Sequence, residues 1–178
     1  MEGVFNFSKA INAVLYIIKH IKRADFHKIF KILYFSDRDM LAQTGMMITG
    51  DTYIAMNDGP VPSNIYDIFK SVRGDGFFKN MSDLSSFIGV ENWDIVVAKK
   101  DPDMGQFSKM DIKIIDNAIQ KYGNLSWDEI REKSHDYAWR STTLNRPMSV
   151  KDMLIESGSD DGFIQYVKEE MELERLVR

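Results

Sequence analysis

Residues 25–45 read DFHKIFKILYFSDRDMLAQTG and carry a strong helix signal. Large apolar side chains recur at the three- and four-residue spacing of an amphipathic helix, at Phe26, Ile29, Phe30, Leu33, Met40 and Leu41. Asp25 is placed to begin this helix, and Gly45 is well placed to end it. The stretch therefore predicts a long helix that buries an apolar stripe, around which the rest of the fold is expected to pack.

Further helices are predicted on both sides of this one. Ser8 is read as the cap of an earlier helix, and Ser63 as the cap of a later one that Gly74 ends. Three S-x-x-[DE] capping boxes begin at Ser108, Ser126 and Ser149, and they predict helices at 109–122, 127–134 and 150–156. A last helix is expected from about residue 160.

Short β elements are expected between these helices. Residues 52–56 precede the turn signal Asn57-Asp58-Gly59-Pro60, and residues 87–91 and 94–99 surround Asn92-Trp93. The predicted fold class is mainly α (α+β). We expect a single compact helical domain over residues 1–178, with about six to seven helices and a small β hairpin or short strands. Residues from about 149 to 178 are expected to form a C-terminal helical extension.

The composition excludes several kinds of functional site and indicates where the protein is found. The chain has no Cys, which excludes disulfides, cysteine nucleophiles and Cys-ligated metal sites. No basic segment precedes an apolar run at the N-terminus, and no apolar run is long enough to span a bilayer. We therefore predict a cytoplasmic protein without a signal peptide and without a membrane partner.

Charge is unevenly distributed. Residues 1–39 hold 7 basic and 4 acidic side chains, whereas residues 151–178 hold 4 basic and 8 acidic ones. We expect the basic stretch, including Lys28 and Lys31, to be a solvated face, with a DNA-associated regulator as the alternative function. Nucleic acid is otherwise not expected as a partner. The acidic end is interpreted as a solvated face or as an acidic partner surface.

Asp37 is unusual because it lies on the apolar stripe, between Leu33 and Met40. A buried carboxylate needs hydrogen-bond donors or a cation, or its pKa rises. The preferred interpretation is structural: Asp37 pairs with a local Arg or accepts backbone N–H groups from the Gly59-Pro60 loop. A catalytic or ligand-binding role remains an alternative, as does a different helix phase.

Other catalytic patterns are absent from the sequence. The three His residues lack metal-ligand spacing, and there is no nucleophile elbow, P-loop or dinucleotide fingerprint. We therefore predict no enzyme, no metal and no cofactor. An enzyme built around Asp37, Asp51 and His135 is kept as an alternative. His135 is expected to donate to a backbone carbonyl, and Trp139 to anchor the core or its edge.

Four methionines, Met40, Met46, Met47 and Met56, surround the irregular segment that comes after the long helix. Their flexible side chains fill irregular cores, and we prefer that interpretation. They also suit surfaces that adapt to protein partners, which is the alternative.

Three segments together carry a family resemblance: residues 31–38 (KILYFSDR), residues 48–67 (ITGDTYIAMNDGPVPSNIYD), and Ser134-His135 followed by Trp139. Their order and amino-acid sequences resemble those of the Panacea-domain family of SocA-like antitoxins and phage-associated GepA-type proteins, over about residues 8–140. Asp136-Tyr137-Ala138 departs from the Glu- and Pro-containing version expected between His135 and Trp139.

The resemblance implies an antitoxin of a bacterial or phage toxin–antitoxin module, which neutralises a protein toxin encoded by an adjacent gene through direct contact. It also implies a protease as a further partner if the chain works as an adaptor, as one relative does. The candidate structural or partner-surface motif consists of Asp37, Arg38, Asp51, Tyr53, Gly59, Pro60, Val61, Pro62, Tyr66, His135 and Trp139. We interpret it as a positioned turn, in which Gly59 takes a positive φ and Pro60 and Pro62 stiffen the chain after it.

Overall fold

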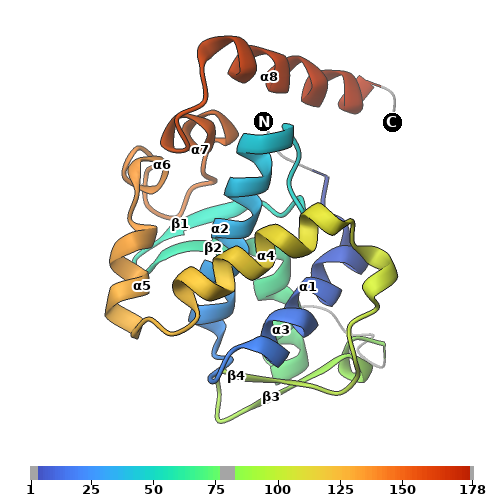
Figure 1. Cartoon of the computed structure of the whole chain (residues 1–178). Coiled ribbons are helices and arrows are strands. Elements are labelled where there is room, and N and C mark those ends of the chain that lie inside the picture. The colour runs from blue at the N-terminus through green and yellow to red at the C-terminus, as the bar shows by residue number, and fades with distance from the viewer. Residues whose placement is uncertain (1–3, 77–82, 177–178) are drawn as a thin grey trace.

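Helix α2 (Phe26–Thr44) runs through the middle of the molecule, and the other elements pack around it (Figure 1). The structure, a computed structural model, describes residues 4–76 and 83–176. Every side chain from residue 28 to residue 37 is buried, because helices α1, α4, α5 and α7 and strand β2 all contact α2. The expected solvated basic face is therefore wrong at Lys28 and Lys31, which the surrounding helices and strand cover.

The predicted helices form at or near their expected positions. Within the described residues there are eight α-helices: α1 (Phe7–His20), α2, α3 (Ser63–Arg73), α4 (Lys109–Tyr122), α5 (Trp127–Ser134), α6 (Tyr137–Arg140), α7 (Val150–Glu156) and α8 (Asp161–Leu176). Two 3₁₀ turns, Leu84–Ser86 and Met104–Gln106, complete the set. The helix beyond the expected six to seven is α6, a single turn that is capped by Asp136.

Two antiparallel hairpins complete the mainly α architecture. Strands β1 (Tyr53–Met56) and β2 (Gly59–Pro62) form one, and β3 (Ile88–Glu91) and β4 (Ile95–Ala98) form the other. β2 was not predicted, because it holds two prolines, which cannot donate hydrogen bonds to a sheet. Residues 145–148 cover the other edge of β1, since the Ala55 amide donates to the Arg146 carbonyl and the Met148 amide to the Tyr53 carbonyl.

The helix caps differ in part from those predicted. Asn6, and not Ser8, caps α1 by accepting a hydrogen bond from the Lys9 amide at 3.0 Å. The capping boxes at Ser108 and Ser126 are complete, whereas Ser149 accepts only the Asp152 amide. These differences arise because one turn of chain places several polar side chains near the same orphan amides.

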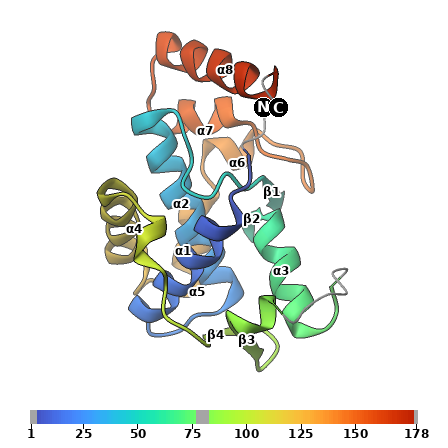
Figure 2. The same ribbon diagram turned by 90° about the vertical axis from the view of Figure 1, so that its right-hand side faces the viewer.

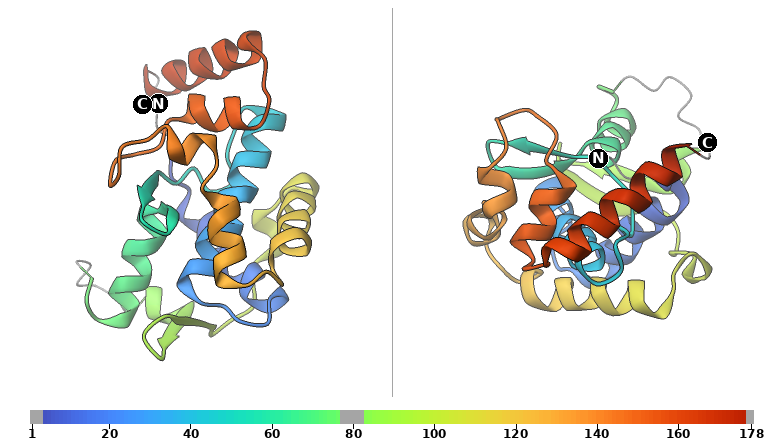
Figure 3. Two further views of the ribbon diagram at one scale, coloured as in Figure 1. Left: turned by 90° about the vertical axis from the view of Figure 1, so that its left-hand side faces the viewer. Right: turned by 90° about the horizontal axis from the view of Figure 1, so that it is seen from above.

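Helix α8 lies at one end of the molecule, across the C-terminal end of α2 and against α7 (Figures 2 and 3). Ile164 and Val167 of α8 are buried, and Gly45 at the end of α2 lies against Val167 and Tyr166. In the part of the chain that the structure describes, no helix is long and apolar enough to cross a bilayer.

Candidate functional site

The three segments that carry the family resemblance meet where α2, the β1–β2 hairpin and the α5–α6 segment pack together (Figure 1). We call this region the hairpin junction. It comprises Lys31, Tyr34, Asp37, Arg38, Thr49, Asp51, Tyr53, Gly59, Pro60, Ser134, His135, Asp136 and Trp139. Most of these side chains are buried, so the geometry of their hydrogen bonds decides what the junction does.

Asp37 ties the middle of α2 to the chain that leads into β1. Its carboxylate is fully buried and accepts hydrogen bonds from the Thr49 amide at 2.9 Å, from the Thr49 hydroxyl, and from the Tyr53 hydroxyl at 2.7 Å. Burial raises the pKa of Asp37 to about 6, and these hydrogen bonds oppose the rise. The helix phase predicted from sequence is confirmed, but the donors come from Thr49 and Tyr53 rather than from the Gly59-Pro60 loop.

Asp51 caps helix α3 from outside the helix. Its carboxylate accepts the Ile65 amide at 3.0 Å, the Asn64 amide at 3.0 Å and the Asn64 side-chain amide at 2.9 Å. The expectation that Ser63 caps α3 is wrong, because the N-cap position is Pro62 and Ser63 is the first helical residue. The orphan amides of α3 are thus satisfied by a residue 12 or more positions earlier in the chain.

Lys31 is a buried cation under the turn of the β1–β2 hairpin. Its ammonium donates to the Pro60 carbonyl at 3.0 Å, and burial lowers its pKa to about 7. Gly59 makes this approach possible, because it has φ +98° and a Cβ there would lie 2.3 Å from the Ser134 hydroxyl and 2.9 Å from Lys31 Cε. The positive φ predicted for Gly59 is confirmed, and close packing against α2 and α5 adds a second reason for glycine.

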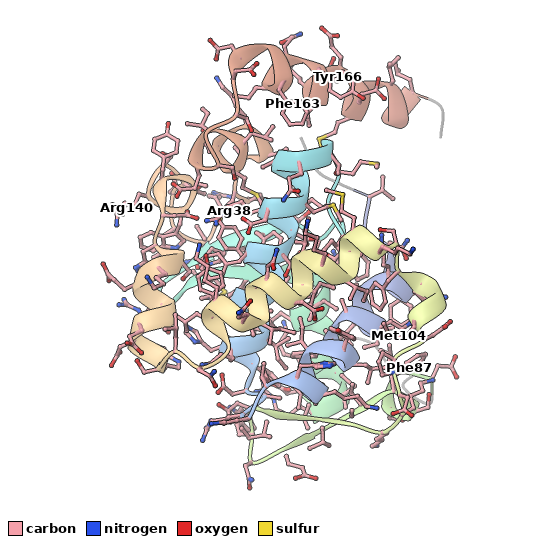
Figure 4. The ribbon with its side chains drawn as sticks, viewed as in Figure 1. Arg38, Phe87, Met104, Arg140, Phe163 and Tyr166 are labelled. Carbon is pink, nitrogen blue, oxygen red and sulfur yellow. The ribbon has the colours of Figure 1, made fainter. Side chains whose placement is uncertain are left out.

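Arg38 and Asp136 join α2 to α6. The Asp136 carboxylate accepts the Tyr34 hydroxyl at 2.7 Å and the Arg38 guanidinium at 3.1 Å, and its other oxygen accepts the Trp139 amide at 3.0 Å. Figure 4 shows Arg38 on the side of α2 that faces the α5–α7 segment. One acidic side chain therefore caps α6 and holds it against the central helix. Asp136 lies in the segment where the chain departs from the sequence expected for the family.

His135 and Trp139 form a stacked pair beside the hairpin. Their ring centroids are 3.7 Å apart and the rings are nearly parallel, at 2°. The indole N–H of Trp139 donates to the Met56 carbonyl at 3.0 Å, which confirms an anchoring role at the edge of the core. The carbonyl expected for His135 is not observed, since its buried Nε2 has no hydrogen-bond partner among the described residues. Burial lowers the pKa of His135 and favours the neutral ring.

A second stacked pair, His27 on Trp127, also reaches the hairpin turn. The ring centroids are 4.5 Å apart, and His27 Nε2 lies 3.2 Å from the Asp58 carbonyl oxygen. Arg131 reaches the same turn from α5 through the Asp58 carboxylate and the Asn57 carbonyl. Two imidazole–indole stacks and one guanidinium therefore hold the hairpin tip in place.

Most of the residues predicted from sequence to form the motif are brought together in the hairpin junction, and three are not. Val61 is partly buried within β2, opposite Ile54. Tyr66 lies on α3, where its ring packs edge-on against Phe30 and under the Lys70 ammonium rather than in the junction. Pro62 pairs with Tyr53 and ends β2 at the start of α3.

Sequence reasoning missed the junction residues Lys31, Tyr34, Thr49, Ser134 and Asp136. A signal existed for two of them. Lys31 lies one helical turn before Phe35, and Tyr34 one turn before Arg38, so each pair shares one side of α2. The links of Thr49 to Asp37 and of Asp136 to Tyr34 gave no local signal, because these partners are 12 and about 100 residues apart.

The junction offers little to a cofactor or a metal. Asp37 and Asp51 already accept several hydrogen bonds each, and within residues 4–76 and 83–176 no three His, Asp or Glu side chains are placed to hold a metal ion. The arrangement can orient a hairpin and three helices with respect to one another.

Comparison with known proteins identifies one family. Residues 29–140 match the family model described as "Antitoxin SocA-like, Panacea domain". The match begins within α2 and ends at the last residue of α6, so it includes every residue of the hairpin junction. No match was found among curated proteins or among solved structures.

Proposed function

The chain belongs to the antitoxin SocA-like, Panacea domain family, and we propose that it neutralises a cognate protein toxin by direct contact in the cytoplasm of a bacterial or phage-carrying cell. The family supports an antitoxin-type role in general. The proposal adds that the toxin is encoded by an adjacent gene and that this chain binds it without catalysing a reaction.

The observation that carries the proposal is the family match over residues 29–140, together with what the matched residues do. The polar side chains of the motif are used internally: Asp37 binds Thr49 and Tyr53, and Asp51 caps α3. Such a network positions a hairpin and helices for a binding surface, and it leaves neither carboxylate free to act as a base or nucleophile.

The alternative of a DNA-associated regulator has less support. Of the basic N-terminal side chains, Lys28 and Lys31 are buried, and Lys9 and Lys19 pair with Asp111 and Asp101. A duplex-binding face needs several unpaired cations that reach phosphates. Duplex DNA binding measured against salt concentration tests the alternative, and a steep salt dependence would revive it.

Co-expression tests the proposal. The product of the adjacent gene, induced alone, is expected to stop growth, and induction of this chain together with it is expected to restore growth. Copurification of the two proteins as a complex then tests direct contact. The proposal fails if the adjacent product is harmless, or if its toxicity persists while this chain is soluble and folded in the same cells.

A further inference from the structure

A groove of about 560 Å³ lies between α8, the loop after α2 and the N-terminal segment, and Thr49 is the one residue of its lining that also belongs to the hairpin junction. We call it the α8 groove. Its lining includes Val4, Phe7, Met46, Met47, Tyr166 and Glu170. Figure 4 shows Phe163 and Tyr166 on α8 above the end of α2, where the helix forms one wall of this groove.

The groove exposes large apolar side chains. Val4, Phe7, Met46 and Tyr166 line it and are between 40% and 63% exposed. Leu173, one turn beyond the lining residues of α8, is also exposed. Apolar side chains that gather in this way mark interaction sites, whereas isolated exposed ones do not. The preferred interpretation of the methionine cluster as core filling is therefore wrong for Met46, although Met40 is buried as expected.

Most polar side chains of the lining are already engaged. Lys9 pairs with Asp111 at 2.8 Å, Thr49 binds Asp37, and the Thr44 hydroxyl donates to the Met40 carbonyl at 2.9 Å. Glu170 is different: it is exposed, and it has no hydrogen bond or ion pair to any residue in the described parts of the chain. A small polar ligand would find few side chains to orient it here, whereas an apolar segment with a cation would find both of its complements.

The negative charge of α8 indicates that a segment bound in the groove carries a cation. Glu169, Glu170 and Glu172 are exposed on α8, and residues 151–178 hold 8 acidic and 4 basic side chains. Acidic residues beside exposed apolar side chains favour partners that carry lysine or arginine at the edge of an apolar face. The flexible side chains of Met46, Met47 and Met171 allow the groove to adapt to that face.

We propose that the α8 groove binds a basic amphipathic segment of the partner protein, with its apolar side chains over Met46 and Tyr166 and a cation beside Glu170. This inference rests on the proposed function for the identity of the partner. It assigns recognition to a surface whose α8 wall lies outside the family match, which ends at residue 140. Helix-in-groove recognition of this kind uses apolar anchors one turn apart.

Methyl NMR tests the site directly. The protein is labelled on its methionine methyl groups and titrated with a synthetic amphipathic peptide of leucine and lysine. The methyl signals of Met46, Met47 and Met171 are expected to shift, while those of the exposed Met104 and Met110 stay in place. Shifts confined to Met104 or Met110, or equal binding of a matched leucine–glutamate peptide, would overturn the inference.

Peptide binding by variants and their matched controls is the second test of the site. Glu170→Lys and Met46→Asp are each expected to weaken peptide binding by about tenfold or more. Glu132→Lys makes the same charge change on α5, outside the lining, and Met104→Asp makes the same change on an exposed methionine that lies away from α8 (Figure 4). Both variants are expected to bind as the wild type does. Unchanged binding by Glu170→Lys and Met46→Asp would overturn the inference, as would a homodimer that Met46→Asp dissociates.

The co-expression assay separates this inference from the proposed function. If the wild type restores growth and Met46→Asp does not, both stand. If Met46→Asp restores growth as well as the wild type does, the groove assignment fails and the antitoxin proposal stands. If the wild type itself does not restore growth, the antitoxin proposal fails, and the peptide titration alone decides whether the groove binds basic segments.

Discussion

The hairpin junction and the α8 groove treat their side chains in opposite ways. The junction buries charged and polar groups, among them Lys31, Asp37 and Asp51, and gives each of them hydrogen-bond partners. The groove leaves Met46 and Tyr166 exposed and Glu170 without a partner among the described residues. The comparison shows that the charged and polar residues of the motif, which look catalytic in the sequence, stabilise the fold. The exposed surface of the groove is formed mainly by apolar residues.

The largest expected effect in the junction comes from Trp139→Ala. It removes the stack on His135 and the hydrogen bond to the Met56 carbonyl, and it should lower the free energy of unfolding by about 3–5 kcal/mol. Trp127→Ala removes the corresponding but more exposed stack on His27, and it should cost clearly less. Denaturant unfolding measures both. A stable Trp139→Ala protein that no longer binds its partner would move Trp139 from the scaffold to the interface.

Gly59→Ala tests the close packing at the hairpin turn. Gly59 and Gly74 both have positive φ, 98° and 104°, but only at Gly59 would a Cβ meet other side chains. Gly74→Ala should therefore cost about 1–2 kcal/mol, from backbone strain alone. Gly59→Ala should cost about 2–4 kcal/mol, because overpacking against Ser134 and Lys31 adds to the strain. Equal losses in thermal unfolding would show that the turn can move away from α2.

Asp37→Ala removes the acceptor for three buried donors on Thr49 and Tyr53. Leaving such donors unsatisfied should lower the free energy of unfolding by about 1–3 kcal/mol. Gln43→Ala, six positions along the same helix, truncates an exposed side chain and should change stability by less than about 0.5 kcal/mol. An unchanged melting temperature for Asp37→Ala would contradict the role given to the junction.

Lys31 predicts a specific pH dependence. Its pKa is about 7 in the folded protein against 10.5 in the unfolded chain, so between these values the unfolded chain binds more protons and stability rises with pH. The slope from this one group is at most about 1.4 kcal/mol per pH unit, and it vanishes below pH 7. Urea unfolding of the wild type and of Lys31→Met from pH 7 to 9 isolates it. Parallel profiles would show that Lys31 is not a buried, partly neutral amine.

Much of the fold could be predicted from local patterns. The stripe on α2, the capping boxes at Ser108 and Ser126 and the stop at Gly45 depend on neighbours three or four residues away, and the structure confirms them. Strand β2 is not predicted because its two prolines cannot donate hydrogen bonds to a sheet. The cap of α3 is not predicted because Asp51, which accepts the amides of Asn64 and Ile65, lies 13 to 14 residues earlier in the chain.

The candidate site divides in the same way. The motif residues could be named because their wording matches a family, and the burial of Asp37 followed from its place on the apolar stripe. The hydrogen bonds of Asp37 to Thr49 and Tyr53 and of Asp136 to Tyr34 and Arg38 could not be predicted, since they join residues 12 to about 100 positions apart. Exposure of Met46 also gave no sequence signal, because a methionine after a helix is as well suited to the core as to a surface.

The most direct test is amide hydrogen exchange of the free chain and of its copurified complex with the toxin. It shows whether the α8 groove contacts the partner while the hairpin junction only stabilises the fold. Partner binding is expected to slow exchange in residues 44–48 and 166–171, the parts of the loop after α2 and of α8 that line the α8 groove. Exchange in the hairpin junction is expected to be slow already in the free chain, and to change little. Protection confined to residues 127–140, with the groove unaffected, would show that the partner docks on the junction instead.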